Sequence, residues 1–156
     1  MREAPQDAKP EDWHRHFAAL ANDRAWTLAE QRTDGRDDDE LLAAAHASAW
    51  HWDAVGTPLQ RLRARMLLAH VHALVGHGAT ALVLAGDMRR EFLAGPDTPD
   101  WELALVHAIH AHAAHAAGDA QAHAESYRRA DAALAAIADD DDRELVTRTF
   151  RQVPVP

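Results

Sequence analysis

Apolar residues recur three and four positions apart along most of the chain, the spacing that keeps them on one face of an α-helix. Glycine and proline interrupt this pattern at sites where one helix commonly ends and the next begins. The interruptions are Asp34-Gly35, Gly56-Thr57-Pro58, Gly76-His77-Gly78, Gly95-Pro96 with Pro99, and Gly118-Asp119. The pattern predicts helices over residues 11–33, 38–55, 59–76, 79–94, 99–117 and 120–138, with a short one over 141–149.

These elements predict one all-α domain over residues 11–149, in which six or seven antiparallel helices form one compact array. No segment combines β-branched residues with strict alternation, so no sheet is expected. A break in the first helix around Asn22 is an alternative. Residues 1–10, with their prolines, predict a flexible lead-in. The Val-Pro-Val-Pro ending predicts an extended tail over residues 150–156 that lies on the surface.

The turns divide the helices into hairpins. Gly76 and Gly118 occupy matching turns roughly forty residues apart, which is within the range of periods found in arrays of helical hairpins. Gly118-Asp119, followed by Tyr127 and Ala130, resembles the second half of a tetratricopeptide repeat. In that family a Gly-Asp or Gly-Asn turn is followed by an aromatic residue and then by a small one.

Gly76, Ala81 and Ala85 resemble the same repeat more loosely, so the resemblance extends over residues 60–138. It implies a short right-handed array of tetratricopeptide-like hairpins. It also implies a concave face, lined by the first helix of each hairpin, that binds a peptide or a partner helix. The segment Ala45–Trp52 is also similar to one found in a set of uncharacterised bacterial proteins, which imply no particular function.

The formal charge of −9 comes largely from two acidic segments, Asp34–Glu40 and Asp139–Asp142, which we interpret as solvated surface. A field of this sign repels a phosphate backbone, so we expect no nucleic-acid partner. No apolar run approaches the ~20 residues that span a bilayer, and the N-terminus lacks the apolar region of a secretory signal. With no cysteine in the chain, a cytoplasmic location is the default expectation.

Several kinds of catalytic chemistry are missing from the sequence. Lys9, the only lysine, lies in the lead-in, which excludes a phosphate-loop lysine or a Schiff base within the domain. Neither serine, Ser48 or Ser126, lies in a Gly-x-Ser-x-Gly turn. Thiolate nucleophiles and cysteine-ligated metals are also excluded. We therefore expect a protein that is not an enzyme and has no catalytic residues.

Histidines are the candidate functional residues of this chain. There are twelve, and ten of them lie between His46 and His123. Counting outward from the Gly56-Thr57-Pro58 turn places His46 level with His70. His70 and His110 also lie equally far, eight residues, before a glycine of the turn that follows, Gly78 and Gly118 respectively. The spacing predicts a layer of His46, His70 and either His107 or His110. Nearby on the same helices are the other expected ligand- or partner-binding residues, Trp50, Asp53 and Arg63.

The histidines are open to three interpretations. The favoured one is structural, with each imidazole either bonded between Ala-lined helices or exposed to solvent. A divalent metal bound by His46, His70, His107 and His110 is the alternative, although no two histidines have the i, i+4 spacing that suits chelation best. Acid–base catalysis by His46 and Asp53 is the third, and two helical turns separate this pair.

The function that we expect is a non-enzymatic binding module for a protein or peptide partner, with a histidine-based metal or small-ligand protein as the alternative. Self-association through the first helix or the Ala-rich helix over 99–117 is a third option. Trp26, Trp52 and Trp101 are expected in the core, and Trp50 against a pocket. Burial of several histidines predicts sensitivity to acid.

Overall fold

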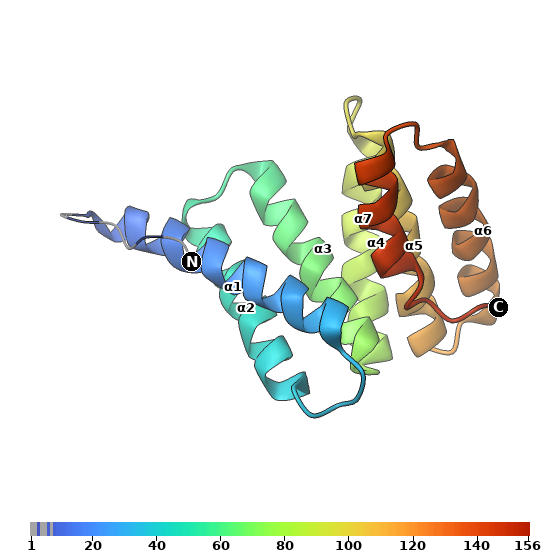
Figure 1. The fold of residues 1–156 in the computed structure, drawn as a ribbon, viewed down its shortest axis with the longest axis horizontal. Helices are drawn as coiled ribbons and strands as arrows, with labels where there is room; N and C mark the ends of the chain where they lie inside the picture. The colour runs from blue at the N-terminus through green and yellow to red at the C-terminus, as the bar shows by residue number, and fades with distance from the viewer. Residues whose placement is uncertain (1–2, 4–5, 7) are drawn as a thin grey trace.

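The computed structural model describes residues 3, 6 and 8–156. Over this part of the chain it contains seven α-helices and no strand (Figure 1). The helices are α1 (Pro10–Gln31), α2 (Asp38–Val55), α3 (Pro58–Leu74), α4 (Gly78–Ala94), α5 (Asp100–Ala116), α6 (Ala120–Ala136) and α7 (Asp140–Phe150). Each lies close to a predicted helix, so the all-α fold class is confirmed.

Local signals explain where several of these helices begin and end. Thr57 opens α3 with a capping box, because its hydroxyl accepts from the backbone N–H of Gln60 and the Gln60 side chain accepts from the N–H of Thr57. At the other end, Gly76 adopts a φ of +81°, and the N–H of His77 donates to the carbonyl of His72 at 2.9 Å. Gly118 ends α5 in the same way with a φ of +78°.

The helices form two layers. Helices α1, α3, α5 and α7 contact one another in that order, and α2, α4 and α6 each pack against the helices before and after them. Near its end the chain returns to α1, where the Gln152 side chain donates to the carbonyl of Ala29 at 2.7 Å. Arg148 lies 3.8 Å from Glu30 beside this contact. The layer of odd-numbered helices is therefore bent, with α1 and α7 meeting at one end (Figure 1).

Small residues allow the helices to approach closely. Helix α5 is lined by fully buried alanines, namely Ala104, Ala108, Ala111, Ala113 and Ala114. Larger side chains such as Leu67, Met88 and Ile109 fill the spaces between the helices. Of the glycines, Gly78, the first residue of α4, has the closest neighbour, because a Cβ there would meet the backbone of Ala116.

Two expectations about the ends of the chain need correction. The tail is not confined to the surface, because Val153 is buried against Ala108 and Ala111 and the carbonyl of Pro154 lies 2.7 Å from His123 Nε2. Its prolines prevent a helix but do not prevent an apolar valine from packing. Half of the expected flexible lead-in, residues 1, 2, 4, 5 and 7, lies outside the described residues, and Pro10 already begins α1. That helix continues through Asn22 without a break.

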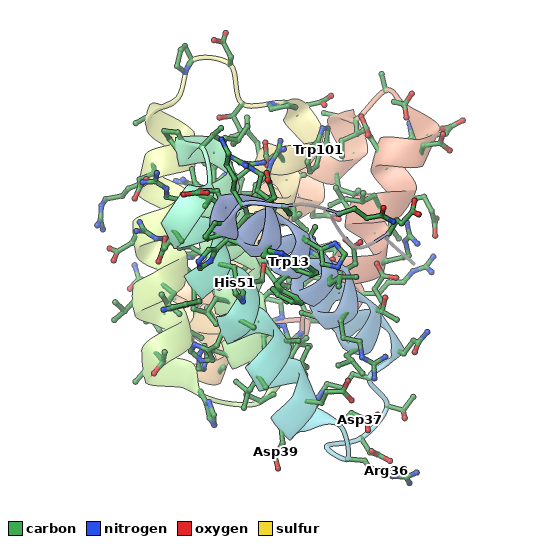
Figure 2. All side chains as sticks on the ribbon, turned by 90° about the vertical axis from the view of Figure 1, so that its left-hand side faces the viewer. Trp13, Arg36, Asp37, Asp39, His51 and Trp101 are labelled. Atoms are coloured by element: carbon green, nitrogen blue, oxygen red, sulfur yellow. The ribbon has the colours of Figure 1, made fainter. Side chains whose placement is uncertain are left out.

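The acidic segment before α2 is exposed, as expected for a solvated run of charge. Figure 2 shows Arg36, Asp37 and Asp39 at the edge of the molecule, where the chain passes from α1 to α2. None of the helices formed by the described residues is long and apolar enough to cross a membrane.

The close approach at Gly78 gives a prediction about stability. Gly78→Ala places a methyl group against Ala116, so we expect the free energy of unfolding to fall by about 1–3 kcal/mol. Gly86→Ala is the matched control, because this glycine lies inside the same helix with open space at its Cβ position. There the change is expected to stabilise the helix by roughly 0.5–1 kcal/mol. Urea unfolding followed by circular dichroism measures both, and equal effects would contradict the packing argument.

Candidate functional site

The predicted site residues are distributed over several places in the structure. His46 is exposed on α2, and its Nε2 lies 3.2 Å from Nε2 of His72 rather than near His70. His72 Nδ1 in turn lies 3.1 Å from Nδ1 of His77. The predicted layer therefore does not form. The reason is rotational, because His70 and His72 lie on opposite flanks of α3 and α2 packs against the flank that carries His72.

His70 is buried, with only 1% of its surface exposed, and its ring stacks on Trp26 with 5.4 Å between ring centroids. On its other side lies His112, at 6.4 Å. Burial lowers the pKa of His70 to about 3, with a smaller contribution from His112. Nδ1 of His70 has no hydrogen-bond partner. His70 is therefore a neutral imidazole that packs like an aromatic ring.

The predicted metal ligands are not arranged around one point. His107 and His110 lie on α5, where His110 Nδ1 is 2.8 Å from the hydroxyl of Ser126. Nδ1 of His107 is buried without a partner. No group of three or more His, Asp or Glu side chains within the described part of the chain is placed to hold a metal ion. The four predicted ligands therefore do not form a metal site among the described residues.

Trp50 and Asp53 are exposed residues of α2. Trp50 is 65% exposed, and its ring contacts His14 and His51 at 5.4 and 4.9 Å between centroids. It lines neither of the hollows described below, so it does not form the pocket wall that we expected. Asp53 is exposed. In Figure 2, His51 and Trp13 lie near the middle of this face, apart from Trp101.

Four histidines of the α3–α5 interior make stability depend on pH. Burial is the main cause that lowers the pKa of His70 to about 3 and those of His107, His110 and His112 to about 4. Their folded-state pKa values therefore lie below the ordinary value of about 6.5 that applies in the unfolded chain. The unfolded state binds more protons below pH 6.5, so stability is full above that pH and falls as the pH drops towards 4.

We expect the urea midpoint to fall steadily between pH 7 and pH 4.5 because the unfolded chain takes up these protons. His70→Leu removes one titrating group, and the pH dependence of its unfolding free energy should be shallower than that of the wild type. Urea titrations at several pH values, followed by tryptophan fluorescence, measure both slopes. A midpoint that does not change over this range would show that the histidines take up protons as readily in the folded protein as in the unfolded chain.

A hollow of about 270 Å³ opens on the layer of odd-numbered helices, and all four of them contribute to it. Its walls are mostly apolar, with a few charged groups at the margin. The lining residues are Asn22, Trp26 and Glu30 from α1, Arg63 and Met66 from α3, Trp101, Glu102 and Leu105 from α5, and Leu145 and Thr149 from α7. Of the predicted site residues, only Arg63 lies here.

Arg63 forms a bidentate ion pair with Glu102. Arg63 Nε donates to Oε1 at 2.6 Å and Nη2 donates to Oε2 at 3.0 Å, which raises the pKa of Arg63. The Glu102 side chain is 1% exposed and that of Arg63 is 42% exposed. The guanidinium also lies 5.6 Å from the ring centroid of Trp101. Both charges are thereby fixed at the edge of the hollow.

The ion pair also borders a second, more open hollow of about 420 Å³, between the start of α3 and the turn that joins α4 to α5. Arg63 and Glu102 line both hollows. The second is otherwise walled by residues such as Leu59, Phe92 and Pro99. The two hollows therefore meet at the ion pair.

Sequence reasoning selected Arg63 but missed Glu102. The signal for Glu102 is its position on α5, where it shares a helical face with Leu105, Val106 and Ile109, all of which are buried. A carboxylate on an apolar face requires a partner, because an unpaired buried charge is costly. The partner lies 39 residues away in sequence, which a helical pattern alone does not identify.

The ion pair predicts an asymmetric response to mutation. Arg63→Met leaves the buried Glu102 carboxylate without a partner and should lower the free energy of unfolding by about 3–5 kcal/mol. Glu102→Gln should cost less, because Arg63 can reach solvent. The double variant Arg63→Met/Glu102→Leu should recover most of the loss. Urea unfolding at pH 7.5 measures the set, with Arg90→Met, from an exposed pair on α4, as the control. Equal losses for the two single variants would contradict this account.

No protein-family model matches the chain, and comparisons with curated proteins and with solved structures found no match either.

Proposed function

We propose that this protein is a non-enzymatic binding module that holds a segment of a partner protein in the hollow between α1, α3, α5 and α7. The observation that carries the proposal is the convergence of all four odd-numbered helices on one recess with two tryptophans in its wall. Recesses with apolar walls and a few fixed polar groups are the usual form of binding sites. The resemblance to tetratricopeptide hairpins supports the same face, since that family binds peptides on its concave side.

The size of the hollow suggests what would occupy it. A volume of about 270 Å³ is below that of most pockets for drug-sized ligands and suits one or two side chains of a peptide. Trp26, Met66, Trp101, Leu105 and Leu145 offer apolar contact, so an aromatic or large aliphatic side chain would fill it best. A partner helix or strand would place such an anchor in the recess.

The ion pair would orient the bound segment. Arg63 uses Nε and Nη2 for Glu102, which leaves Nη1 for a carbonyl or carboxylate of the partner. Glu102 and Arg63 neutralise each other, so the recess does not select strongly for net charge. Because the second hollow shares this pair, an extended segment could pass from one hollow into the other.

The proposal assigns no catalytic role to the ion pair. A carboxylate held by both oxygens in a bidentate pair is a poor general base, because its lone pairs are already engaged. An arginine in the same pair remains protonated. The arrangement supports recognition better than proton transfer.

Selection of peptides from a displayed random library tests this function. We expect the wild-type protein to enrich peptides with an aromatic or aliphatic anchor. Asn22→Trp, which fills the recess from α1, should weaken their binding at least roughly tenfold, equivalent to about 1.4 kcal/mol. Leu93→Trp is the control, since Leu93 is exposed on α4 and lines neither hollow. Isothermal titration calorimetry gives the affinities.

Two results would overturn the proposal. One is a selection that enriches no peptide above background. The other is a set of peptides that bind Asn22→Trp as tightly as they bind the wild type and Leu93→Trp, which would place their site elsewhere. Circular dichroism on the three proteins establishes that each variant is folded before the affinities are compared.

A further inference from the structure

Arg89 is a half-buried guanidinium on α4 that forms no ion pair with a carboxylate of the described residues. Burial lowers its pKa, and so does the nearby charge of Arg129, while the charge of Glu125 acts in the opposite direction. Each of the other half-buried arginines within the described residues pairs with a carboxylate. These pairs are Arg32 with Asp38, Arg63 with Glu102 and Arg143 with Asp140. Arg89 is therefore a partly desolvated cation without a directly bonded counter-charge, an arrangement that proteins usually avoid.

The only hydrogen-bond partners of Arg89 in the described structure are neutral and weakly held. Its Nη1 lies 3.4 Å from the Ser126 hydroxyl and 3.4 Å from His110 Nδ1. Ser126 Oγ is 2.8 Å from the same His110 nitrogen, so the hydroxyl can donate to His110 while it accepts from Arg89. This network uses one nitrogen of the guanidinium. Nε and Nη2, the edge that forms bidentate bonds with an anion, remain available.

Arg129 supplies a second positive charge from α6. Its Nη2 donates to Glu125 at 2.6 Å, and its charge acts on Arg89, His107 and His110. Helices α4 and α6 both pack against α5, and the contact of Arg89 with Ser126 bridges them over it. Asp119 and Glu125 are the acidic groups that act on His110, and Glu125 also acts on Arg89, although Arg129 already engages Glu125.

We propose that Arg89, Ser126 and Arg129, together with His107 and His110 of α5, form a binding site for a phosphate group. These five residues are called the outer cluster below. Two guanidinium groups from different helices match the charge of a phosphate dianion and its tetrahedral oxygens better than they match a planar carboxylate. None of the five lines either hollow, so this site is independent of the proposed peptide recess.

Within the outer cluster each residue has a distinct part. Arg89 presents its free edge to two phosphate oxygens, and Arg129 approaches the anion from α6. Ser126 holds the Arg89 side chain in place through the hydroxyl that contacts both Arg89 and His110. His107 Nδ1, buried without a partner, is the remaining group that a phosphate oxygen or a bridging water could reach. Binding would supply the directly bonded counter-charge that Arg89 lacks.

The test uses the full chain without a tag, in chloride buffer at pH 7.5. We expect titration with inorganic phosphate to raise the melting temperature saturably at constant ionic strength, because the ligand binds the folded state. Arg89→Gln should weaken phosphate binding at least roughly tenfold, and Arg129→Gln should weaken it as well. Arg90→Gln is the matched control, since this neighbour on α4 is exposed and pairs with Asp87.

A second measurement keeps the test decisive. Removing an uncompensated buried charge should not destabilise the protein, so Arg89→Gln in phosphate-free buffer should melt at or above the wild-type temperature. O-phospho-L-serine is titrated in parallel with inorganic phosphate. Tighter binding than free phosphate would indicate a phosphorylated molecule as the ligand, and weaker binding would indicate the free ion. The proposal is overturned if neither compound saturates, or if Arg89→Gln binds as tightly as Arg90→Gln.

Discussion

Helix α5 packs against four other helices, and it can do so because much of its surface is alanine. An alanine side chain lets two helix axes approach closely, and it loses no rotamer entropy when buried. The same constraint appears at Gly78, where the start of α4 touches the end of α5 without room for a methyl group. Helix α5 links α3 and α7 of one layer to α4 and α6 of the other, so the positions of the hollow and of the outer cluster depend on it.

Close packing of small residues also explains why so many histidines lie inside the protein. An imidazole is flat and can stack, as His70 does on Trp26, without forcing the helices apart. It remains neutral there, at the cost of stability in acid. Charged side chains, by contrast, need a bonded partner when they are buried. Glu102 is buried because Arg63 reaches it from the next odd-numbered helix, whereas Arg89 has only a serine and a histidine.

The sequence predicted the helices well because their boundaries are encoded locally. Thr57 and Gln60 form a capping box, and Gly76 and Gly118 adopt the positive φ that ends a helix. The site was predicted poorly because it depends on how helices rotate against one another. Counting from a turn gave the level of His46 and His70 along their helices but not the direction in which each one faces. The pairing of Arg63 with Glu102 likewise depends on a contact between helices that are not neighbours in sequence.

The contact between Gln152 and the carbonyl of Ala29 joins positions that are 123 residues apart. Helix α7 contributes Leu145 and Thr149 to the hollow, so the recess is complete only when this distant closure has formed. During synthesis, α1 to α6 would emerge and pack first, leaving the hollow open along one side. Because this contact joins residues that are far apart in the sequence, it is slow to form. It is also expected to be among the first contacts to open in local unfolding. The complete hollow would then appear last in folding and disappear first under stress, before the hairpins themselves melt.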